Sequence, residues 1–473
     1  MSDTEQKLDP ALRRLSWILI VGLVAALLDT TVVNVAINTL RGELHASVET
    51  VQWVNTGYLL AMGMVVPLSG WSMQRFGAKT MWLVALSVFL IGSVLSGASW
   101  DIDSLIAFRV LQGLGGGLMF PILQTVLVQA SGGRNVGKLM ATVGLPAVVV
   151  PILGPVVGGL IISNTDWRWI FFINVPICLV GLVLAWFGVP KSARQGGGRL
   201  DVLGLVLLSP ALVALLYGLS QVSVRGGFGD PGVIIPLAVG AVLLVLFCVH
   251  ALRTRTEPVV DLRLFRSRSF AVSSMLLFLS GLSLYSAMFL LPLYFQQVEG
   301  YSALRTGAWL ALQGVGSLAS RNAFGRLTDR IGPRPVVLIG SVLTAVAMLV
   351  FTQASPDTST VVLGAALVVF GVGLGGATVA VMVGAYQGLR PAAIPHASSA
   401  TRILQQVGGS FGTTVLALIL AGELAGRGAA DKAGAFDVTF WWSFGFVLLA
   451  VVLALLLPGR ARSREPETAP AAN

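Results

Sequence analysis

Fourteen apolar stretches, each about twenty residues long, constrain the fold of this chain more than any other feature of its sequence. A helix of that length crosses the roughly 30 Å hydrocarbon core of a bilayer and satisfies its own backbone hydrogen bonds there. The sequence therefore predicts an all-α polytopic membrane protein. The stretches begin near Leu15, Val51, Thr80, Ser104, Lys138, Trp169, Leu200, Gly232, Ser269, Ser302, Pro335, Thr360, Ala397 and Asp437.

The composition agrees with this class and indicates no catalytic chemistry. Of 473 residues, 55% are hydrophobic and 11% are charged, and the mean hydropathy is +0.84. A soluble domain carries about 25% charged residues. The two cysteines, Cys178 and Cys248, lie in apolar runs, and the sequence shows no catalytic triad, metal-ligand cluster or phosphate-binding loop. We therefore expect no enzyme, no metal and no cofactor.

The lysines and arginines indicate the orientation, because the cytoplasmic loops of membrane proteins carry an excess of both. With the N-terminus inside, most of the 31 fall in segments counted as cytoplasmic, including Arg321 and Arg402. The segments counted as external carry Arg41, Arg168, Arg225, Arg305, Arg427 and Lys432. The net charge of +10 thus belongs to a membrane surface and not to a nucleic-acid site. We predict a multi-pass protein of the cell membrane with both termini cytoplasmic.

A short pattern occurs twice, once in each half of the chain. The copy after the second span contains Gly70, Gln74, Arg75, Gly77 and Lys79. The copy after the tenth span contains Gly325, Asp329, Arg330, Gly332 and Arg334. Paired halves that move about a central site are the usual architecture of secondary transporters.

The repeat predicts the domain organisation. The first six spans match the last six, so the seventh and eighth form an inserted pair. The expected parts are a cytoplasmic N-terminus (1–14), an N-terminal six-helix bundle (15–190), the inserted spans with their flanking loops (191–268), a C-terminal six-helix bundle (269–458) and a cytoplasmic tail (459–473).

Asp29 is the carboxylate that lies deepest within a predicted span. It lies about 14 residues, or roughly 21 Å, from the inner end of the first span, and Arg109 lies roughly 8 Å below the outer face on the fourth. The two depths agree, which predicts a contact. The pair is either a structural ion pair joining two spans or a proton-coupling site, and we favour the second because intramembrane charges usually serve function.

The stretch from Gly144 to Gly159 combines an uncharged membrane span with residues that bend or expose a helix. It contains three prolines and four glycines. One interpretation is a close-packed crossing between helices through small residues; the other is a bent helix that takes part in gating. The residues concerned are Gly144, Pro151, Gly154, Pro155, Gly158 and Gly159.

Polar and aromatic side chains within the spans are candidates for a substrate cavity. An apolar and aromatic cavity with a few hydrogen-bonding groups suits amphipathic substrates of varied shape. The alternative is that these side chains pack against protein. The candidates are Asn34, Gln124, Tyr285, Tyr294, Gln297, Trp309, Gln313 and Gln405.

Five motifs together resemble a known family, the fourteen-span drug/proton antiporters of the major facilitator superfamily. The matching segments are Leu28–Ala36, Gly70–Lys79, Arg109–Gly117, Gly144–Gly159 and Trp167–Pro176. The segment Gly70–Lys79 is similar to the superfamily pattern GxxxDRxGRK, and Gly144–Gly159 to the antiporter pattern GxxxxxxxxGPxxGG. Two positions depart from the family, because Gln74 replaces the usual Asp and Asn38 replaces the usual Pro.

The resemblance implies a fold and a function. The major facilitator fold has a cavity between two six-helix bundles that opens alternately to each side. The chain would act as a monomer in the lipid bilayer and exchange protons for amphipathic small molecules, driven by the proton gradient. The Gln74 departure leaves the charged latch of the repeated loop only in the C-terminal half, at Asp329.

Two other functions remain open from the residues. The same fold could export a specific metabolite, peptide or lipid, which a drug-susceptibility panel with the gene deleted and overexpressed would reveal. A membrane enzyme or sensor without transport would need a catalytic cluster or a soluble domain, and the sequence shows neither.

Overall fold

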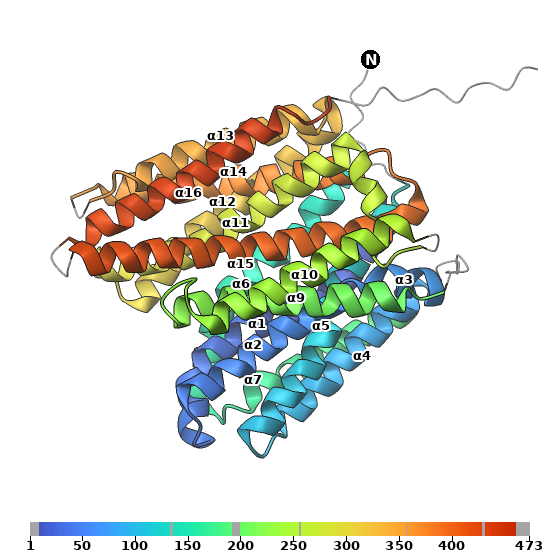
Figure 1. Ribbon diagram of the computed structural model, residues 1–473, viewed down its shortest axis with the longest axis horizontal. Helices are drawn as coiled ribbons and strands as arrows, with labels where there is room; N and C mark the ends of the chain where they lie inside the picture. The colour runs from blue at the N-terminus through green and yellow to red at the C-terminus, as the bar shows by residue number, and fades with distance from the viewer. Residues whose placement is uncertain are drawn as a thin grey trace, which may run out of the picture.

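The protein is helical throughout the part that the structure describes. The computed structural model describes residues 9–132, 136–191, 199–254, 257–355, 357–427 and 431–459, and within these ranges it has no β-strand. Most of the two predicted terminal segments lies outside these ranges. Figure 1 shows the N-terminal helices, blue to teal, gathered below the C-terminal helices, yellow to red, with the green helices α9 and α10 lying along the boundary between the two groups.

In chain order the helices are described by the parts that the repeat predicts, and this division into parts stays a prediction. The N-terminal half contains α1 (Pro10–Glu43), α2 (Val48–Val65), α3 (Leu68–Phe76), α4 (Ala78–Gly97), α5 (Ile102–Ala130), α6 (Val136–Asn164), α7 (Trp169–Phe172) and α8 (Asn174–Gly188). The inserted pair is α9 (Val202–Val224) and α10 (Pro231–Arg253), followed by the short helix η1 (Leu262–Arg266). The C-terminal half contains α11 (Arg268–Gln297), α12 (Ala303–Ile331), α13 (Pro333–Phe351), α14 (Thr360–Tyr386), η2 (Pro391–Ala393), α15 (Ile394–Arg427) and α16 (Lys432–Ala454).

The long helices alternate in direction, which gives the bundle two ends. We call inner end the end at which the chain passes Gly77, Gly188, Arg253, Gly332 and Tyr386, and outer end the end at which it passes Glu43, Gly97, Asn164, Val224, Gln297, Phe351 and Arg427. The inner end is the one predicted to face the cytoplasm. It also carries both ends of the described chain.

Glycine shapes the repeated loop in the same way in both halves. Gly77, with φ of 87°, is the only residue between α3 and α4, and Gly332, with φ of 89°, is the only residue between α12 and α13. Residues with a Cβ rarely adopt a positive φ. The two glycines therefore explain why the repeat has a sharp corner at this position.

The number of membrane crossings is established in part. Eleven helices in the described ranges are long and apolar enough to span a bilayer. The other long helices, α2, α6 and α12, are not among them. In α12 the reason is its polarity, since it carries Arg305, Gln313, Arg321, Arg326 and Asp329. The count of fourteen spans stays a prediction.

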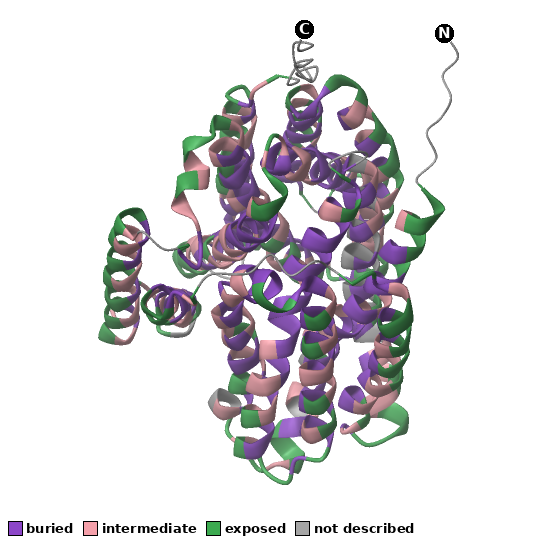
Figure 2. Ribbon diagram, turned by 90° about the vertical axis from the view of Figure 1, so that its right-hand side faces the viewer, coloured by how far each residue is buried: buried purple, intermediate pink, exposed green. Residues whose placement is uncertain are grey.

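Among the residues whose burial the structure describes, the apolar core is continuous between the halves at the inner end. One cluster of buried residues there joins side chains of α1, α4 and α5 to residues of the C-terminal half, including Val379, Ile394 and Ala397. Towards the outer end, the N-terminal half has a core of its own around Val32 and Phe171, and the C-terminal half has a separate one. Figure 2 shows these buried residues lying between the helices and exposed ones on the outside. The halves are thus sealed to each other at the inner end.

Helices α6, α9 and α15 carry most of the helix packing between the parts. Helix α6 packs on α1 of its own half and on α12 and α14 of the other. Helix α15 packs on α3 and α5 across the boundary, and α9 packs on both α2 and α15. A movement between the halves must therefore involve these three helices.

The orientation can be tested with single cysteines in a protein from which Cys178 and Cys248 have been removed. Thr80 and Arg334 are exposed at the inner end, and Asp357 is exposed at the outer end. We expect a membrane-impermeant thiol reagent added to intact cells to modify cysteine at position 357 but not at 80 or 334. The opposite labelling pattern would mean that the chain is inserted the other way round.

Candidate functional site

The predicted contact between Asp29 and Arg109 is present, and both side chains are fully buried. Arg109 Nη1 on α5 donates a hydrogen bond to Asp29 Oδ2 on α1. Gln112 Nε2 and Asn174 Nδ2 both donate to the other carboxylate oxygen, at 2.9 and 3.1 Å. Three donors from two further helices thus surround a fully buried carboxylate and favour its charged form.

Ser93 on α4 completes this network. Its hydroxyl accepts hydrogen bonds from Gln112 Nε2 at 3.1 Å and from Asn174 Nδ2 at 3.0 Å, and it donates to the Phe171 carbonyl at 2.9 Å. The network therefore joins α1, α4, α5 and α8 around Asp29. It holds together the N-terminal bundle and not the boundary with the other half.

The surroundings of Arg109 are also arranged to hold a cation. Its Nε donates to the Val54 carbonyl at 3.1 Å, and its guanidinium lies 4.0 Å from the centre of the Tyr58 ring. Nη2 has no acceptor among the described residues. Breaking a buried ion pair by removing one partner costs about 3–5 kcal/mol, so the charge state of Asp29 affects the whole bundle.

Glycines allow the close helix approach that places Arg109. A Cβ atom at Gly113 would lie 2.4 Å from the Tyr58 carbonyl oxygen on α2, and one at Gly115 would lie 2.4 Å from the Phe89 nitrogen on α4. Real Cβ atoms do not come that close to backbone atoms. The glycine pattern following Arg109 is therefore a requirement of packing around the ion pair.

The glycine-rich helix α6 packs against α1 immediately beyond Asp29. A Cβ at Gly154 would lie 1.9 Å from Thr31 Oγ1, and one at Gly158 would lie 3.1 Å from the Val32 carbonyl oxygen. The structure therefore shows the close-packed crossing, and α6 is one helix along its whole length. Gly144, Pro151 and Pro155 lie within that helix, whereas a Cβ at Gly159 would meet no atom within 4 Å.

The first repeated loop contacts the other half at the inner end. Gln74 Nε2 on α3 donates to the Ala392 carbonyl at 3.1 Å and lies 3.1 Å from His396 Nε2 on α15. Ser69 and Ser399 are joined by a hydrogen bond of 2.6 Å. Hydrogen bonds between neutral groups thus occupy the place where the family resemblance implies a charged latch. Arg75 is exposed, and Lys79 Nζ donates to the Trp186 carbonyl at 2.6 Å within its own half.

The second repeated loop occupies the equivalent corner of the C-terminal half. Gly325, Asp329 and Arg330 lie on the last turns of α12, and Arg334 is exposed on the first turn of α13. Their latch role stays a prediction.

Three cavity candidates lie at or near the boundary between the halves. Gln124 on α5 accepts a hydrogen bond from Tyr386 on α14 at 3.0 Å, and its Nε2 lies 3.2 Å from Met382 Sδ. Gln405 on α15 accepts from Arg402 at 3.3 Å. Tyr285 on α11 is 38% exposed.

The remaining candidates have other surroundings. Tyr294 is buried in the outer core of the C-terminal half, and Trp309 stacks on Phe295. Gln297 is exposed at the outer end, and Gln313 is half-buried on α12. The side chain of Asn34 lies outside the described residues.

Two arginines that the sequence assigns to cytoplasmic segments lie within long helices, and the side of the membrane on which they lie stays a prediction. Arg321 lies on α12, ten residues before its end, and Arg402 lies on α15, eight residues after its start. Arg402 places its guanidinium 4.6 Å from the centre of the Phe120 ring of the other half. The sequence does contain a pattern that indicates a polar helix face at Arg402, because polar residues recur there at every third position. They are His396, Ser399, Arg402 and Gln405.

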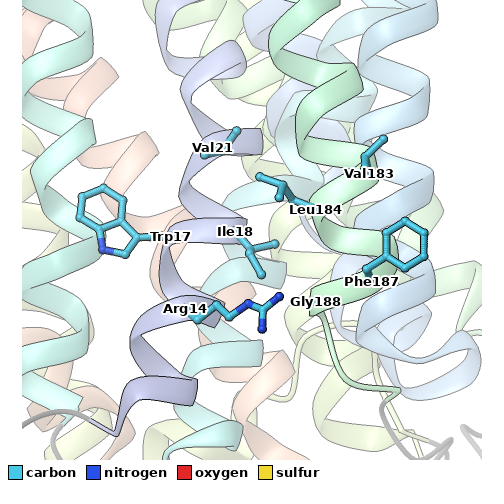
Figure 3. A pocket seen from close by; sticks show the side chains of 8 residues that line it. All are labelled: Arg14, Trp17, Ile18, Val21, Val183, Leu184, Phe187 and Gly188. Atoms are coloured by element: carbon cyan, nitrogen blue, oxygen red, sulfur yellow. The ribbon is translucent and has the colours of Figure 1, made fainter.

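An apolar groove of about 370 Å³ lies between α1 and α8 near the inner end, as Figure 3 shows. Its walls include Trp17, Val183 and Phe187, whose side chains are largely exposed on the outside of the bundle. A groove on that face lies where lipid chains are expected, and it is separate from the boundary between the halves.

Comparison with known proteins decides the family. Residues 19–413 match the family described as the Major Facilitator Superfamily. The chain belongs to the major facilitator superfamily. This member is 35% identical over 416 residues to the multidrug resistance protein B homolog of Mycobacterium tuberculosis (strain H37Rv), covering 88% of this chain and 77% of the relative. It is 29% identical over 409 residues to the lincomycin resistance protein LmrB of Listeria monocytogenes, covering 86% of each.

Solved structures of the superfamily share this fold. The human organic anion transporter MFSD10 matches with a TM-score of 0.65 and 16% identity, over 94% of this chain and all of that one. The proton:xylose symporter XylE matches with a TM-score of 0.66 and 15% identity, over 95% and 96%. The family match and the curated relatives, taken with this fold, make the protein a multi-pass membrane transporter and not an enzyme.

The close contact of α6 with α1 gives a matched pair of substitutions. Gly154→Ala places a methyl group against Thr31, and overpacking of this kind costs about 1–3 kcal/mol. Gly159→Ala meets no atom and gains helix propensity, by about 0.8–1 kcal/mol. We expect Gly154→Ala to lower the melting temperature of the purified protein and to impair transport, and Gly159→Ala to do neither. Equal melting temperatures for the two variants would contradict the packing.

Proposed function

We propose that this major facilitator is a proton-coupled antiporter that exports hydrophobic or amphipathic drugs from the cytoplasm by alternating access. The relatives named for multidrug and lincomycin resistance support the substrate class. The buried Asp29 carboxylate is the single observation that carries the proton coupling, since it is a protonatable group held inside the membrane by an arginine and two amides.

The contacts around Asp29 suggest how its protonation reaches the other half. Asp29 ties α1 to α5 through Arg109, and two residues further along α1, Thr31 contacts Gly154 of α6. Helix α6 in turn packs on α12 and α14. A proton on Asp29 removes the charge that holds Arg109, so α1 can shift and move α6 against the C-terminal half.

The arrangement of the cores corresponds to one stage of such a cycle. The halves share a core at the inner end and have separate cores at the outer end. If the inner end faces the cytoplasm, this state is closed to the cytoplasm and is the one in which Asp29 would take a proton from outside.

One carboxylate implies one proton per cycle, which sets the driving force. Exchanging one proton for a neutral molecule moves one charge, worth about 2.3 kcal/mol per 100 mV, and this sustains a gradient of roughly fifty-fold. Exchange for a monovalent cation moves no net charge, so only the pH gradient would drive that export. The chain would act as a monomer and would need no cofactor.

Asp29→Asn tests the proton coupling directly. The asparagine keeps an acceptor for Arg109 but cannot carry a proton in exchange, so we expect efflux driven by an imposed pH gradient to fall to background in proteoliposomes. Asp166→Asn is the control, because Asp166 forms an exposed ion pair with Arg168 at 3.4 Å. That variant should transport normally.

The probe for this assay would come from a drug-susceptibility panel with the gene deleted and overexpressed. Bound drug should still raise the melting temperature of Asp29→Asn, since the candidate drug-binding residues are unchanged. Full pH-driven efflux by this variant would show that Asp29 is not the coupling group.

A further inference from the structure

His396 lies at the centre of a hydrogen-bonded chain at the inner end that joins the two halves to the inserted helices. Its Nε2 lies 3.1 Å from Gln74 Nε2, and its Nδ1 lies 3.1 Å from the Val259 carbonyl oxygen. Its side chain is buried, with 7% exposure, and Gly70 gives it room, since a Cβ there would lie 3.0 Å from Nδ1. The ring therefore contacts α3 and the segment that follows α10.

The partners of His396 determine where its proton lies. The Val259 carbonyl can only accept a hydrogen bond, so Nδ1 carries a hydrogen. The Gln74 amide donates to the Ala392 carbonyl, which identifies its Nε2 as the atom that faces both Ala392 and the histidine. Its second hydrogen then points to His396 Nε2, which must be an acceptor. All these hydrogen bonds form only with a neutral His396.

The inserted helices hold the Val259 segment in place. Asp201, at the start of α9, accepts a hydrogen bond from Gly204 N at 2.9 Å and lies 2.7 Å from His250 Nε2 near the end of α10. Its other carboxylate oxygen accepts from Val259 N at 3.4 Å. Val259 is 1% exposed, its backbone N–H donates to Asp201, and its backbone carbonyl accepts from His396. The Asp201–His250 contact thus positions the carbonyl that selects the tautomer of His396.

We propose that His396 is a positioning residue of the inner gate, which we define as the contact of Gln74 with Ala392 and His396 at the inner end. The inserted pair α9–α10 fixes His396 in the neutral tautomer that binds Gln74. Protonation of His396 weakens this gate. The protonated ring would present an N–H to the Gln74 amide. Turning the amide over would restore that contact but would bring its oxygen against the Ala392 carbonyl, so one hydrogen bond is lost either way.

The charged groups near His396 come from several elements. Helix α3 carries the exposed Arg75, the turn before η2 carries Arg390, and α15 itself carries Arg402 one and a half turns away. The inserted helices contribute Asp201 and His250, and the segment after α10 contributes the exposed Glu257 and the half-buried Asp261. Within the described part of α5, the inner half carries no charged residue.

The sign of the pH effect follows from the preferred protonation state. The hydrogen bonds of the closed inner end need a neutral His396, so closing is weakened as acidification protonates the ring. One linked proton changes the ratio of closed to open molecules by at most about tenfold per pH unit. A glutamate in place of Gln74 would bind the protonated ring better than the neutral one. It should therefore reverse the effect of pH on the ratio of closed to open molecules.

The experiment measures the distance between two spin labels across the inner end. The labels are attached to Thr80→Cys and Arg334→Cys, which are exposed and lie in opposite halves, in a protein without Cys178 and Cys248. An Asp29→Asn background removes the titration of the buried carboxylate on α1. The purified protein in lipid nanodiscs is compared at about pH 8 and about pH 5.5, the range in which histidine changes charge.

We expect the ratio of closed to open molecules to fall by about tenfold or more on acidification. Gln74→Glu should instead raise that ratio on acidification, and His396→Gln should make it independent of pH. Asp201→Asn should lower the closed fraction at pH 8 while leaving the direction of the pH effect unchanged.

Two results would overturn the proposal. One is a closed fraction that does not change with pH in the labelled protein that keeps Gln74, or that changes in the same direction in this protein and in its Gln74→Glu variant. The other is an unchanged closed fraction in Asp201→Asn, which would remove the role of the inserted pair. The proposal rests on alternating access but not on proton coupling. Its failure would therefore leave the Asp29→Asn transport result intact, and the reverse also holds.

Discussion

The ion pair of Asp29 and Arg109 is the interaction on which the N-terminal half depends. A charge at the centre of a bilayer costs about 2.5–3.5 kcal/mol even by insertion measurements, so each member needs its partner. Gln112 and Asn174 satisfy the other oxygen of the carboxylate, and Ser93 accepts a hydrogen bond from each of these two amides, so the helices that carry them must stay together. One buried carboxylate thus specifies how four helices pack.

The close helix crossings serve that same arrangement. Glycines on α5 let it approach α2 and α4 around Arg109, and glycines on α6 let it lie against α1 next to Asp29. Packing and coupling are therefore not alternatives for the stretch from Gly144 to Gly159. A tight contact is what would allow a small shift of α1 to be transmitted to the boundary between the halves.

The sequence could predict the helices and the ion pair, because both follow from local rules. Apolar length identifies a membrane helix, and equal depth brings Asp29 and Arg109 together. It could not predict Gln74 with His396, since they are far apart in sequence and each is ordinary in its own helix. The helical position of Arg321 and Arg402 could not be predicted either, because α12 and α15 continue through polar turns that a hydropathy pattern does not mark as helix. The protein-packed position of Tyr294 likewise depends on tertiary contacts.

The single-residue corners at Gly77 and Gly332 have a mechanical consequence. With one residue between α3 and α4, and one between α12 and α13, there is no slack for either helix of a pair to slide past the other. The two helices of each pair must therefore move together as one rigid unit. A displacement of the inner end of α3 therefore also displaces α4, so the single-residue loop acts as a stiff connection between the two helices.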